Sequence, residues 1–316
     1  MDDCCWKSCA SKQATRDHSM SQQDNRRVPL SVLIPVKNEA ANLRDCLASV
    51  SFADEIVVVD SASTDGTQEI MAGTGARLMQ FAWNGKFPRK KNWALENISW
   101  QHEWVLIIDA DERITPELEK QIRLAIRRDD VDGFYLNRRF WFLSGWINHC
   151  GYFPSWNLRL FRHRLGRYER AEINGGAGSG DNEVHEHVLL DGRVEYLSAP
   201  MEHYAFPNVA TFIDKHNRYA TWEAAAREQL HQDAGHKALR ATPFGTALER
   251  KRWLKKLAMH APLRPTLRFL YHYVWKQGFR DGYRGWVLCR LLAWYEFVSL
   301  VKAQEMRQLT TRQTDD

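Results

Sequence analysis

The sequence predicts an α/β protein with a mostly parallel sheet flanked by helices and a helical C-terminal extension. Short runs of branched apolar residues alternate with helical periodicity up to about residue 130, and the chain reads as helical from about residue 208 onward. A length of 316 residues suits one large α/β domain plus an appendage. We therefore expect a disordered leader (1–27), a Rossmann-like domain (28–207) and the extension (208–316).

The elements of the first half are predicted in chain order. Residues 30–36 form a first strand, and a helix with its apolar side chains on one face covers about residues 40–50. Residues 55–60 form a second buried strand that ends in an acid. A turn at 61–67 starts another helix, and residues 77–81 form a short third strand.

A helix that begins at residues 90–95 leads into the most informative strand of the chain. Five apolar residues at 104–108 predict a strand buried on both faces, which ends in Asp109 and Asp111. Thr115 then gives a helix N-cap, with proline at the first helical position.

The second half of the α/β domain follows a different pattern. Residues 133–136 and 157–161 are strand-like and are separated by aromatic loops. Residues 173–180 form a glycine-rich loop, which runs into an alternating, strand-like segment at 184–188.

Charge and cysteine content limit the function classes. Lysine and arginine total 44 against 39 acids, and no nucleic-acid-binding module is recognisable, so no nucleic-acid partner is expected. The six cysteines lack paired metal-ligand spacing, which predicts reduced thiols in a cytoplasmic protein, with Cys46 on a core helix. Residues 1–27 lack the apolar segment of a secretory signal.

The two carboxylates after the 104–108 strand indicate metal chemistry. Asp109 and Asp111 lie at the edge where open α/β sheets bind ligands. Hard oxygen ligands at this spacing suit Mg²⁺ or Mn²⁺ carrying a substrate diphosphate. The alternative is a polar strand end with solvated acids. A third acid after a neighbouring strand, Asp60, favours the ligand site.

These motifs resemble those of the inverting family 2 glycosyltransferases of GT-A fold. The likeness rests on residues 35–39, 59–67 and 109–112, and it extends from about residue 29 to about residue 300. Further stretches are similar to the subgroup of lipopolysaccharide-core and lipooligosaccharide β-1,4-glucosyltransferases: residues 91–95, 109–115, 156–162 and 184–186.

The resemblance implies metal-dependent transfer of a hexose, expected to be glucose, from a UDP-sugar to a saccharide or lipid-linked acceptor in lipopolysaccharide or cell-envelope synthesis. It places Asp60 on the uracil ring and Lys91 and Asn92 on the diphosphate or the ribose, while Lys90 is expected in solvent. Helix capping is the alternative for Asp60 and Asp65. The implied nucleotide site comprises Pro35, Val36, Asn38, Glu39, Asp60, Asp65, Lys91, Asn92, Asp109 and Ala110.

The resemblance also implies a metal site and a catalytic base. Asp111 is the expected metal ligand, with Asp109 on the ribose or on the metal through water, and His185 as a third contact. Glu186 is the candidate base that deprotonates the acceptor hydroxyl. The alternative is an ordinary strand at 184–188. The acids that can replace Glu186 as base are Asp181 and Glu183.

The acceptor is expected at a rim formed by residues 149–156. Trp156 either stacks on a sugar or belongs to the core. Arg159 either holds an anionic group of the acceptor or forms a structural ion pair. Family members often carry an acid where this chain has Ser155, so the sequence leaves the acceptor open.

The C-terminal extension mixes cations with aromatic residues, as at 250–257 and 286–298. The second stretch contains Arg290 and Glu296 and is shorter than the ~20 apolar residues of a membrane-spanning helix. Two interpretations are open: peripheral attachment to the inner face of the cytoplasmic membrane, which we favour, and a helical bundle packed on the α/β domain.

Other functions fit the sequence less well. A nucleotidyltransferase generally has a glycine-rich loop after its first strand, and residues 35–41 contain no glycine. A non-catalytic sugar-nucleotide-binding protein is expected to have lost a carboxylate of the metal motif or the base, and both are present. Transfer to a protein or an exopolysaccharide remains an alternative.

Overall fold

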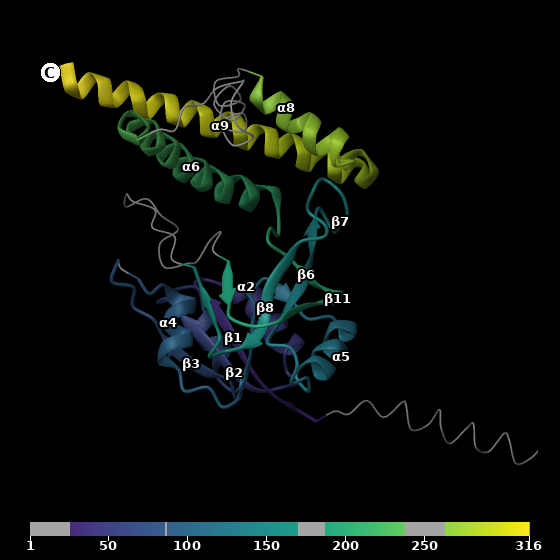
Figure 1. Ribbon diagram of the computed structural model, residues 1–316. Helices are drawn as coiled ribbons and strands as arrows, with labels where there is room; N and C mark the ends of the chain where they lie inside the picture. The colour runs from purple at the N-terminus through teal and green to yellow at the C-terminus, as the bar shows by residue number, and fades with distance from the viewer. Residues whose placement is uncertain (1–25, 86, 170–186, 238–262, 316) are drawn as a thin grey trace, which may run out of the picture.

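In the computed structural model, which describes residues 26–85, 87–169, 187–237 and 263–315, a sheet with helices on both faces carries a group of long helices at one end (Figure 1). The strands are β1 (Val28–Val36), β2 (Ala53–Asp60), β3 (Arg77–Gln80), β4 (Trp104–Ile107), β5 (Glu112–Arg113), β6 (Gly133–Phe142), β7 (Gly145–Ile147), β8 (Trp156–Arg162), β9 (Gly166–Tyr168), β10 (Val188–Leu190) and β11 (Val194–His203). The helices are α2 (Ala40–Ser49), α3 (Thr67–Met71), α4 (Lys90–Asn97), α5 (Pro116–Ala125), α6 (Val209–Lys237), α8 (Arg264–Leu270), the π-helical η1 (Tyr271–Trp275), the 3₁₀-helical η2 (Gly278–Asp281) and α9 (Gly282–Asp315).

Within the described residues, nine strands form one mixed sheet in the order β3-β2-β1-β4-β8-β6-β11-β5, with β7 paired to β6. Strands β3, β2, β1 and β4 run parallel, as the alternation of strands and helices predicts. Strand β8 is antiparallel to both β4 and β6. The carboxyl ends of β1, β2 and β4 therefore meet at one edge, and the predicted α/β fold class with a helical extension is confirmed.

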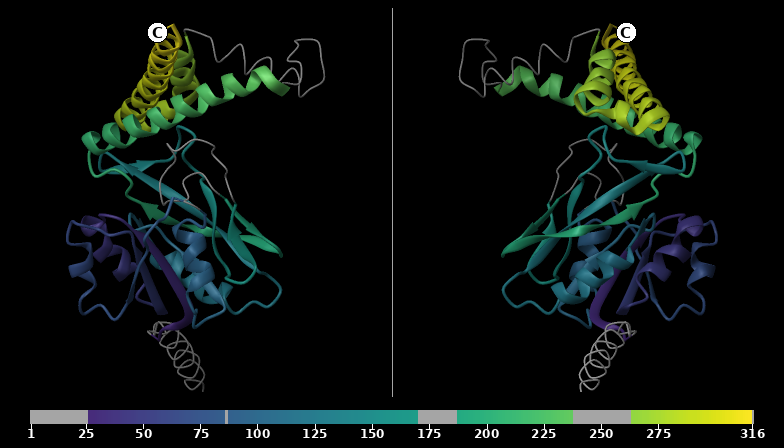
Figure 2. Two further views of the ribbon diagram at one scale, coloured as in Figure 1. Left: turned by 90° about the vertical axis from the view of Figure 1, so that its left-hand side faces the viewer. Right: turned by 90° about the vertical axis from the view of Figure 1, so that its right-hand side faces the viewer.

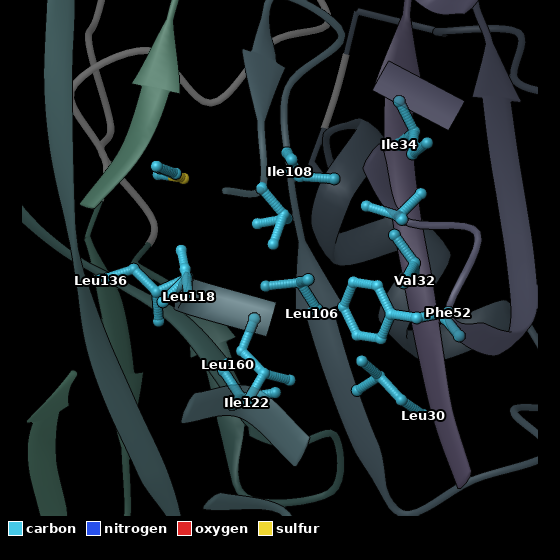
Figure 3. Close-up of a cluster of buried hydrophobic side chains, with 14 of the residues drawn as sticks. Leu30, Val32, Ile34, Phe52, Leu106, Ile108, Leu118, Ile122, Leu136 and Leu160 are labelled. Carbon is cyan, nitrogen blue, oxygen red and sulfur yellow. The ribbon is translucent and has the colours of Figure 1, made fainter. Parts of the chain in front are cut away.

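Strand β1 divides its side chains between two cores because successive residues point to opposite faces of a sheet. On one face, Val32 and Ile34 join side chains of α2, α3 and α5. On the other face, Leu33 joins Ala94 and Leu95 of α4. Figure 3 shows the first core, with labelled side chains that include Val32, Ile34, Phe52, Leu106, Leu118 and Ile122.

Helix α5 begins as the sequence predicts. The Thr115 hydroxyl oxygen accepts a hydrogen bond from the backbone N–H of Leu118 at 3.2 Å, and Pro116 occupies the first turn. Leu118 and Ile122 are fully buried against the sheet. The helix is therefore fixed on the side of the sheet that also holds α2.

Helices α6, α8 and α9 lie beyond the β6–β7 end of the sheet (Figure 2). A third core joins these helices to the strands: Phe142 of β6, Phe212 of α6 and Leu288 of α9 all belong to it. Among the described helices, none is both long enough and apolar enough to cross a bilayer.

Parts of several sequence predictions lie outside the described residues. These are the leader up to residue 25, the glycine-rich loop at 173–180, the segment 184–186 and the basic stretch at 250–257.

Candidate active site

A pocket of about 710 Å³ lies at the carboxyl edge of the parallel strands, with α6 on its far side. The ends of β1 and β4 contribute one wall, and β6, β8 and the end of β11 contribute another. The sheet and the helical extension thus line one cavity. It contains these sequence-predicted site residues: Pro35, Val36, Glu39, Lys91, Asp109, Ala110, Asp111, Trp156 and Arg159.

Asp109 is held between two cations. Its Oδ1 lies 2.9 Å from Nζ of Lys91, and its Oδ2 lies 2.6 Å from a guanidinium nitrogen of Arg159. Burial by itself would raise the pKa of the Asp109 carboxyl, but Arg159 and Lys91 outweigh burial and hold that pKa well below its usual range. Both carboxylate oxygens of Asp109 therefore have protein partners, and Asp109 stays ionised.

Arg159 also ties Asp109 to the next strand. The same guanidinium nitrogen lies 3.0 Å from Oε1 of Glu112, which is fully buried in β5. The other oxygen of Glu112 accepts the backbone N–H of Asp109 at 2.9 Å. This closed loop of contacts fixes the turn that presents Asp111.

Asp111 faces His203, the last residue of β11. Its Oδ2 lies 3.6 Å from Nε2 of His203, and its backbone oxygen accepts the N–H of Tyr204 at 2.8 Å. The pairing of His203 with Glu112, where β11 meets β5, brings the imidazole to this point. Burial would raise the pKa of Asp111, but His203 outweighs it and the pKa is lowered.

Asp111 and His203 fit a divalent metal in donor type. Mg²⁺ is usually held by one or two carboxylates plus substrate phosphates, and an imidazole donor shifts the preference toward Mn²⁺. Ligands at adjacent octahedral positions lie about 3 Å apart, so the 3.6 Å separation needs little adjustment. Among the described residues, no third His, Cys, Asp or Glu completes a metal-binding group. A diphosphate, water or His185 would have to complete the coordination.

Glu39 adds negative charge to the same end of the pocket. Burial, together with the nearby Asp111, raises the pKa of Glu39, while Lys215 of α6 acts in the opposite direction. Two cations already balance Asp109, and a raised pKa disfavours the charged form of Glu39. The negative charge available to a bound cation therefore lies mainly at Asp111.

Known proteins that are similar to this chain include glycosyltransferases. A family model described as Glycosyl transferase family 2 matches residues 31–180. The lipopolysaccharide core biosynthesis glycosyltransferase LpsC of Rhizobium meliloti is 32% identical over 210 residues, which are 63% of this chain and 71% of LpsC.

The chain belongs to glycosyltransferase family 2.

Two further similar proteins match most of the length of this glycosyltransferase. The uncharacterized glycosyltransferase RT0209 of Rickettsia typhi is 23% identical over 294 residues, 88% of this chain and 87% of RT0209. Among solved structures, S. aureus TarS 1–349 in complex with UDP is 18% identical and covers 91% of this chain and 92% of its own, with a TM-score of 0.40. At that TM-score the two chains superpose loosely.

The two adjacent lysines of the glycosyltransferase have different surroundings. Lys91 lines the pocket, and Asp109 raises its pKa against the effect of burial, so the ammonium stays charged. Lys90 is only 1% exposed and donates a hydrogen bond to the backbone oxygen of Val36 at 2.8 Å. The expectation that Lys90 lies in solvent is therefore wrong, because this lysine fastens α4 to the end of β1.

Asp60 and Asn92 lie away from the pocket wall. Asp60 is fully buried and accepts hydrogen bonds from the side chains of Gln68, at 2.9 Å, and Gln80, at 3.2 Å. The Asn92 amide exchanges two hydrogen bonds, each 2.9 Å, with the backbone of Tyr168. Both predicted nucleotide contacts thus have structural partners, and their contact with a nucleotide stays a prediction.

Asn38 and Asp65 connect the loop after β1 to the loop after β2 by hydrogen bonds. The backbone N–H of Asn38 donates to Oγ of Ser63 at 2.8 Å. Oδ2 of Asp65 accepts the N–H of Ala40, the first residue of α2, at 3.0 Å. Oδ1 of Asp65 also accepts the N–H of Thr67, the first residue of α3, at 3.1 Å, which is the contact that the capping alternative describes. Neither Asn38 nor Asp65 lines the pocket.

The acceptor side of the pocket shows two different environments. Trp156 is 38% exposed and meets the ring of Tyr196 edge-on at 5.0 Å. Arg159 is 5% exposed and forms the ion pairs with Asp109 and Glu112. Trp156 is therefore open to a ligand, whereas Arg159 has the structural ion pair that the sequence left as an alternative.

Sequence reasoning missed part of the pocket. His203, Lys215 and Tyr219 all line it, and the last two are one turn apart on α6. No local pattern distinguishes them, since their positions depend on long-range pairing and helix packing. The predicted residues His185 and Glu186 lie outside the described residues, although the next residue along the chain, His187, lines the pocket.

Proposed function

We propose that this glycosyltransferase transfers a hexose, expected to be glucose, from a UDP-sugar to a saccharide or lipid-linked acceptor in lipopolysaccharide or cell-envelope synthesis, with inversion and with Mg²⁺ or Mn²⁺. The observation that carries the proposal is the Asp111–His203 pair, 3.6 Å apart in a pocket that also contains Lys91. The acceptor class is supported by the similarity to LpsC, which is named for lipopolysaccharide core biosynthesis.

The donor half of the proposal follows from the charges in the pocket. Lys91 keeps its ammonium charge beside Asp109, at 2.9 Å, and so offers a fixed cation to a diphosphate. A metal bound by Asp111 and His203 would act as a Lewis acid toward the departing diphosphate. Asp109, with both oxygens engaged by Lys91 and Arg159, acts in this proposal by positioning Lys91.

The acceptor half rests on the aromatic side of the pocket. An exposed indole face, as at Trp156, packs well against the apolar face of a sugar ring. Tyr152 and Ser155 line the same region and offer hydroxyl groups for hydrogen bonds. The predicted rim at residues 149–156 therefore remains our proposed acceptor site.

Inversion requires a base on the acceptor side, and we assign this role to Glu186. His187 and Val188, the residues that follow it, line the pocket. The backbone of β10 is held there by antiparallel pairing with β9. A base in this role must lie within hydrogen-bond distance of the acceptor hydroxyl, and the assignment requires this of Glu186.

The first experiment tests donor and metal together. Hydrolysis of UDP-glucose, UDP-galactose and UDP-N-acetylglucosamine is measured with Mn²⁺, Mg²⁺ or EDTA. We expect activity with UDP-glucose that EDTA abolishes. Asp111→Asn should lower it by about a hundredfold or more, and His203→Ala should raise the Mn²⁺ requirement about tenfold or more.

A matched control for the histidine is His102→Ala. His102 pairs with Asp54 at 2.8 Å and is not part of the pocket wall, so its loss should leave the Mn²⁺ requirement unchanged. Full metal-dependent activity of Asp111→Asn would refute the assigned metal ligand. Activity that is unaffected by EDTA would refute the metal requirement.

The second experiment tests the base. Glu186→Gln keeps the size of the side chain but removes its basicity, so donor binding should be retained while transfer falls by about 10²- to 10⁴-fold. Asp181→Asn and Glu183→Gln serve as comparisons. If one of them, and not Glu186→Gln, eliminates transfer, the base is that residue.

A further inference from the structure

Large apolar side chains are concentrated on the surface of one short segment. Across the described residues, 21 large hydrophobic side chains are exposed, and nine of them lie between residues 263 and 286. Single exposed apolar residues are ordinary, but a contiguous group of this kind marks an interaction surface. The segment comprises α8, η1, η2 and the start of α9.

The group begins as a stripe along α8 and η1. Its members recur at intervals of three or four residues, so they follow one side of the helical path. A helix of a water-soluble protein normally buries such a stripe, whereas α8 and η1 contain no buried residue at all. The exposed residues of this stripe are Leu263, Leu267, Leu270, Tyr271, Val274 and Trp275.

Aromatic residues extend the group onto α9. Phe279 is 52% exposed and Tyr283 is 74% exposed, and the Tyr283 ring stacks with Trp286 at 6.0 Å. The guanidinium of Arg290 lies over both Trp286 and Phe269 of α8, at 6.0 and 5.7 Å. We call the exposed apolar residues of α8, η1, η2 and the start of α9 the docking face; Phe269 itself packs against the third core.

The docking face carries positive charge because the nearby acids point inward. Asp281 accepts hydrogen bonds from the backbone N–H groups of Asn148 and His149, and its side chain is 3% exposed. Glu296 is likewise 3% exposed and pairs with Arg264 and Arg268. Three cations beside the apolar residues form no ion pair with a carboxylate of the described residues: Lys276, whose ammonium lies over the Tyr271 ring, Arg280 and Arg290. Arg284 is turned the other way, with its guanidinium against Gly145 of β7.

We propose that the docking face binds the surface of an anionic lipid bilayer. Tryptophan and tyrosine side chains prefer the boundary between headgroups and acyl chains, and lysine and arginine beside them attract anionic headgroups. The docking face has both features, because its apolar stripe contains tryptophan and tyrosine and lies beside the three cations Lys276, Arg280 and Arg290. The face lies on the surface and needs no membrane-spanning helix.

Attachment by this face would leave the sugar-transfer pocket accessible. Helix α6 supplies Lys215, His216 and Tyr219 to the pocket, and no residue of the docking face lines it. The docking face instead adjoins the β7 end of the sheet, where His272 contacts the backbone oxygen of Cys150 and Asp281 accepts the N–H of His149. Membrane contact at the docking face therefore leaves the pocket lining uncovered. Binding by the docking face does not depend on which sugar is transferred.

The test is sedimentation of the full chain with vesicles. We expect binding to vesicles of phosphatidylcholine with phosphatidylglycerol, and much weaker binding to phosphatidylcholine alone. Tyr271→Ser with Trp275→Ser, and separately Lys276→Gln with Arg280→Gln, should each weaken binding to the mixed vesicles by about tenfold or more. Vesicle binding by the Lys276→Gln, Arg280→Gln variant should also depend much less on salt concentration than binding by the unchanged protein.

Matched controls come from α5 and from the turn that follows it, at the other end of the molecule (Figure 1). Leu124→Ser removes an equally exposed apolar side chain, and Lys120→Gln with Arg127→Gln removes the same charge from exposed positions. Both should bind vesicles as the unchanged protein does. Equal binding by all variants, or no binding to anionic vesicles, would overturn the proposal.

A second copy of the chain is the competing occupant. Sedimentation velocity of the unchanged protein and of the Tyr271→Ser, Trp275→Ser variant separates the two possibilities. A monomer in both cases supports the membrane surface. A dimer that the double substitution dissociates would overturn the proposal and identify the docking face as a contact between protein chains.

Discussion

Arg159 is the residue on which the acidic motif of the pocket depends. The sequence left two roles open for it, an anionic acceptor contact and a structural ion pair. In the structure its guanidinium lies 2.6 Å from Asp109 and 3.0 Å from Glu112, and the side chain is 6% exposed. Burying a carboxylate without a cationic partner costs free energy. Arg159 therefore allows Asp109 and Glu112 to lie close together beside the pocket.

Replacing Arg159 with methionine should therefore destabilise the fold. Lys91 would then be the remaining cation beside Asp109. The remaining cation beside Glu112 would be Arg138, which is more distant, at 3.5 Å. We expect the free energy of unfolding, measured by urea denaturation, to fall by about 3–5 kcal/mol.

The control for this prediction is Arg193→Met. Arg193 pairs with Asp130 and Glu195, but its side chain is 61% exposed, so its loss should cost no more than about 1 kcal/mol. Equal stability of Arg159→Met and the unchanged protein would show that the buried ion pairs contribute nothing to stability.

Helix α2 shows how a single element connects the sheet to the pocket. Its apolar positions were predicted from helical spacing, and Leu43, Cys46 and Leu47 are buried as that spacing requires. The Cys46 thiol also donates to the backbone oxygen of Asp109 at 3.7 Å. The helix therefore packs beneath the turn that carries the acidic motif.

Burial of α2 should make Cys46 unreactive in the folded protein. Burial raises the pKa of the Cys46 thiol well above its ordinary value, so almost no thiolate forms at neutral or mildly alkaline pH. We expect iodoacetamide at about pH 8 to leave Cys46 unlabelled in native protein and to label it in urea, as read by peptide mass spectrometry. Rapid labelling of the native protein would contradict the packing of α2.

At the scale of the whole molecule, the third core decides whether the helices and the sheet behave as one unit. Phe142 of β6, Phe212 of α6 and Leu288 of α9 share this core and are all at most 2% exposed. Loss of core contacts in the helices should therefore also destabilise the sheet, because a shared core unfolds cooperatively.

Leu288→Ala tests this coupling. The substitution should lower the free energy of unfolding by about 2–5 kcal/mol, and urea unfolding followed by tryptophan fluorescence and by far-UV circular dichroism should remain one coincident transition. A separate early transition of the helices, with the sheet unaffected, would show that the two parts unfold independently.

Local patterns in the sequence were sufficient to predict the parallel strands of the sheet and the aspartates that follow them. Buried strands read as continuous apolar runs, and the cap at Thr115 needs only neighbouring residues. The mixed half was not predictable in this way, because pairing of β8, β6 and β11 joins segments that are distant in the chain. The family resemblance distinguished Lys91 from Lys90, but no local signal predicted that Lys90 is buried against Val36.

The sequence by itself determined the α/β class, the family resemblance and the position of Asp109 and Asp111 at a strand end. These follow from hydrophobic periodicity and from short motifs, which are local properties. Only the tertiary structure decided that Asp109 is neutralised by Lys91 and Arg159, that His203 faces Asp111, and that the apolar stripe of α8 points outward. Each of these depends on contacts between distant segments, and such contacts exist only once the chain has packed.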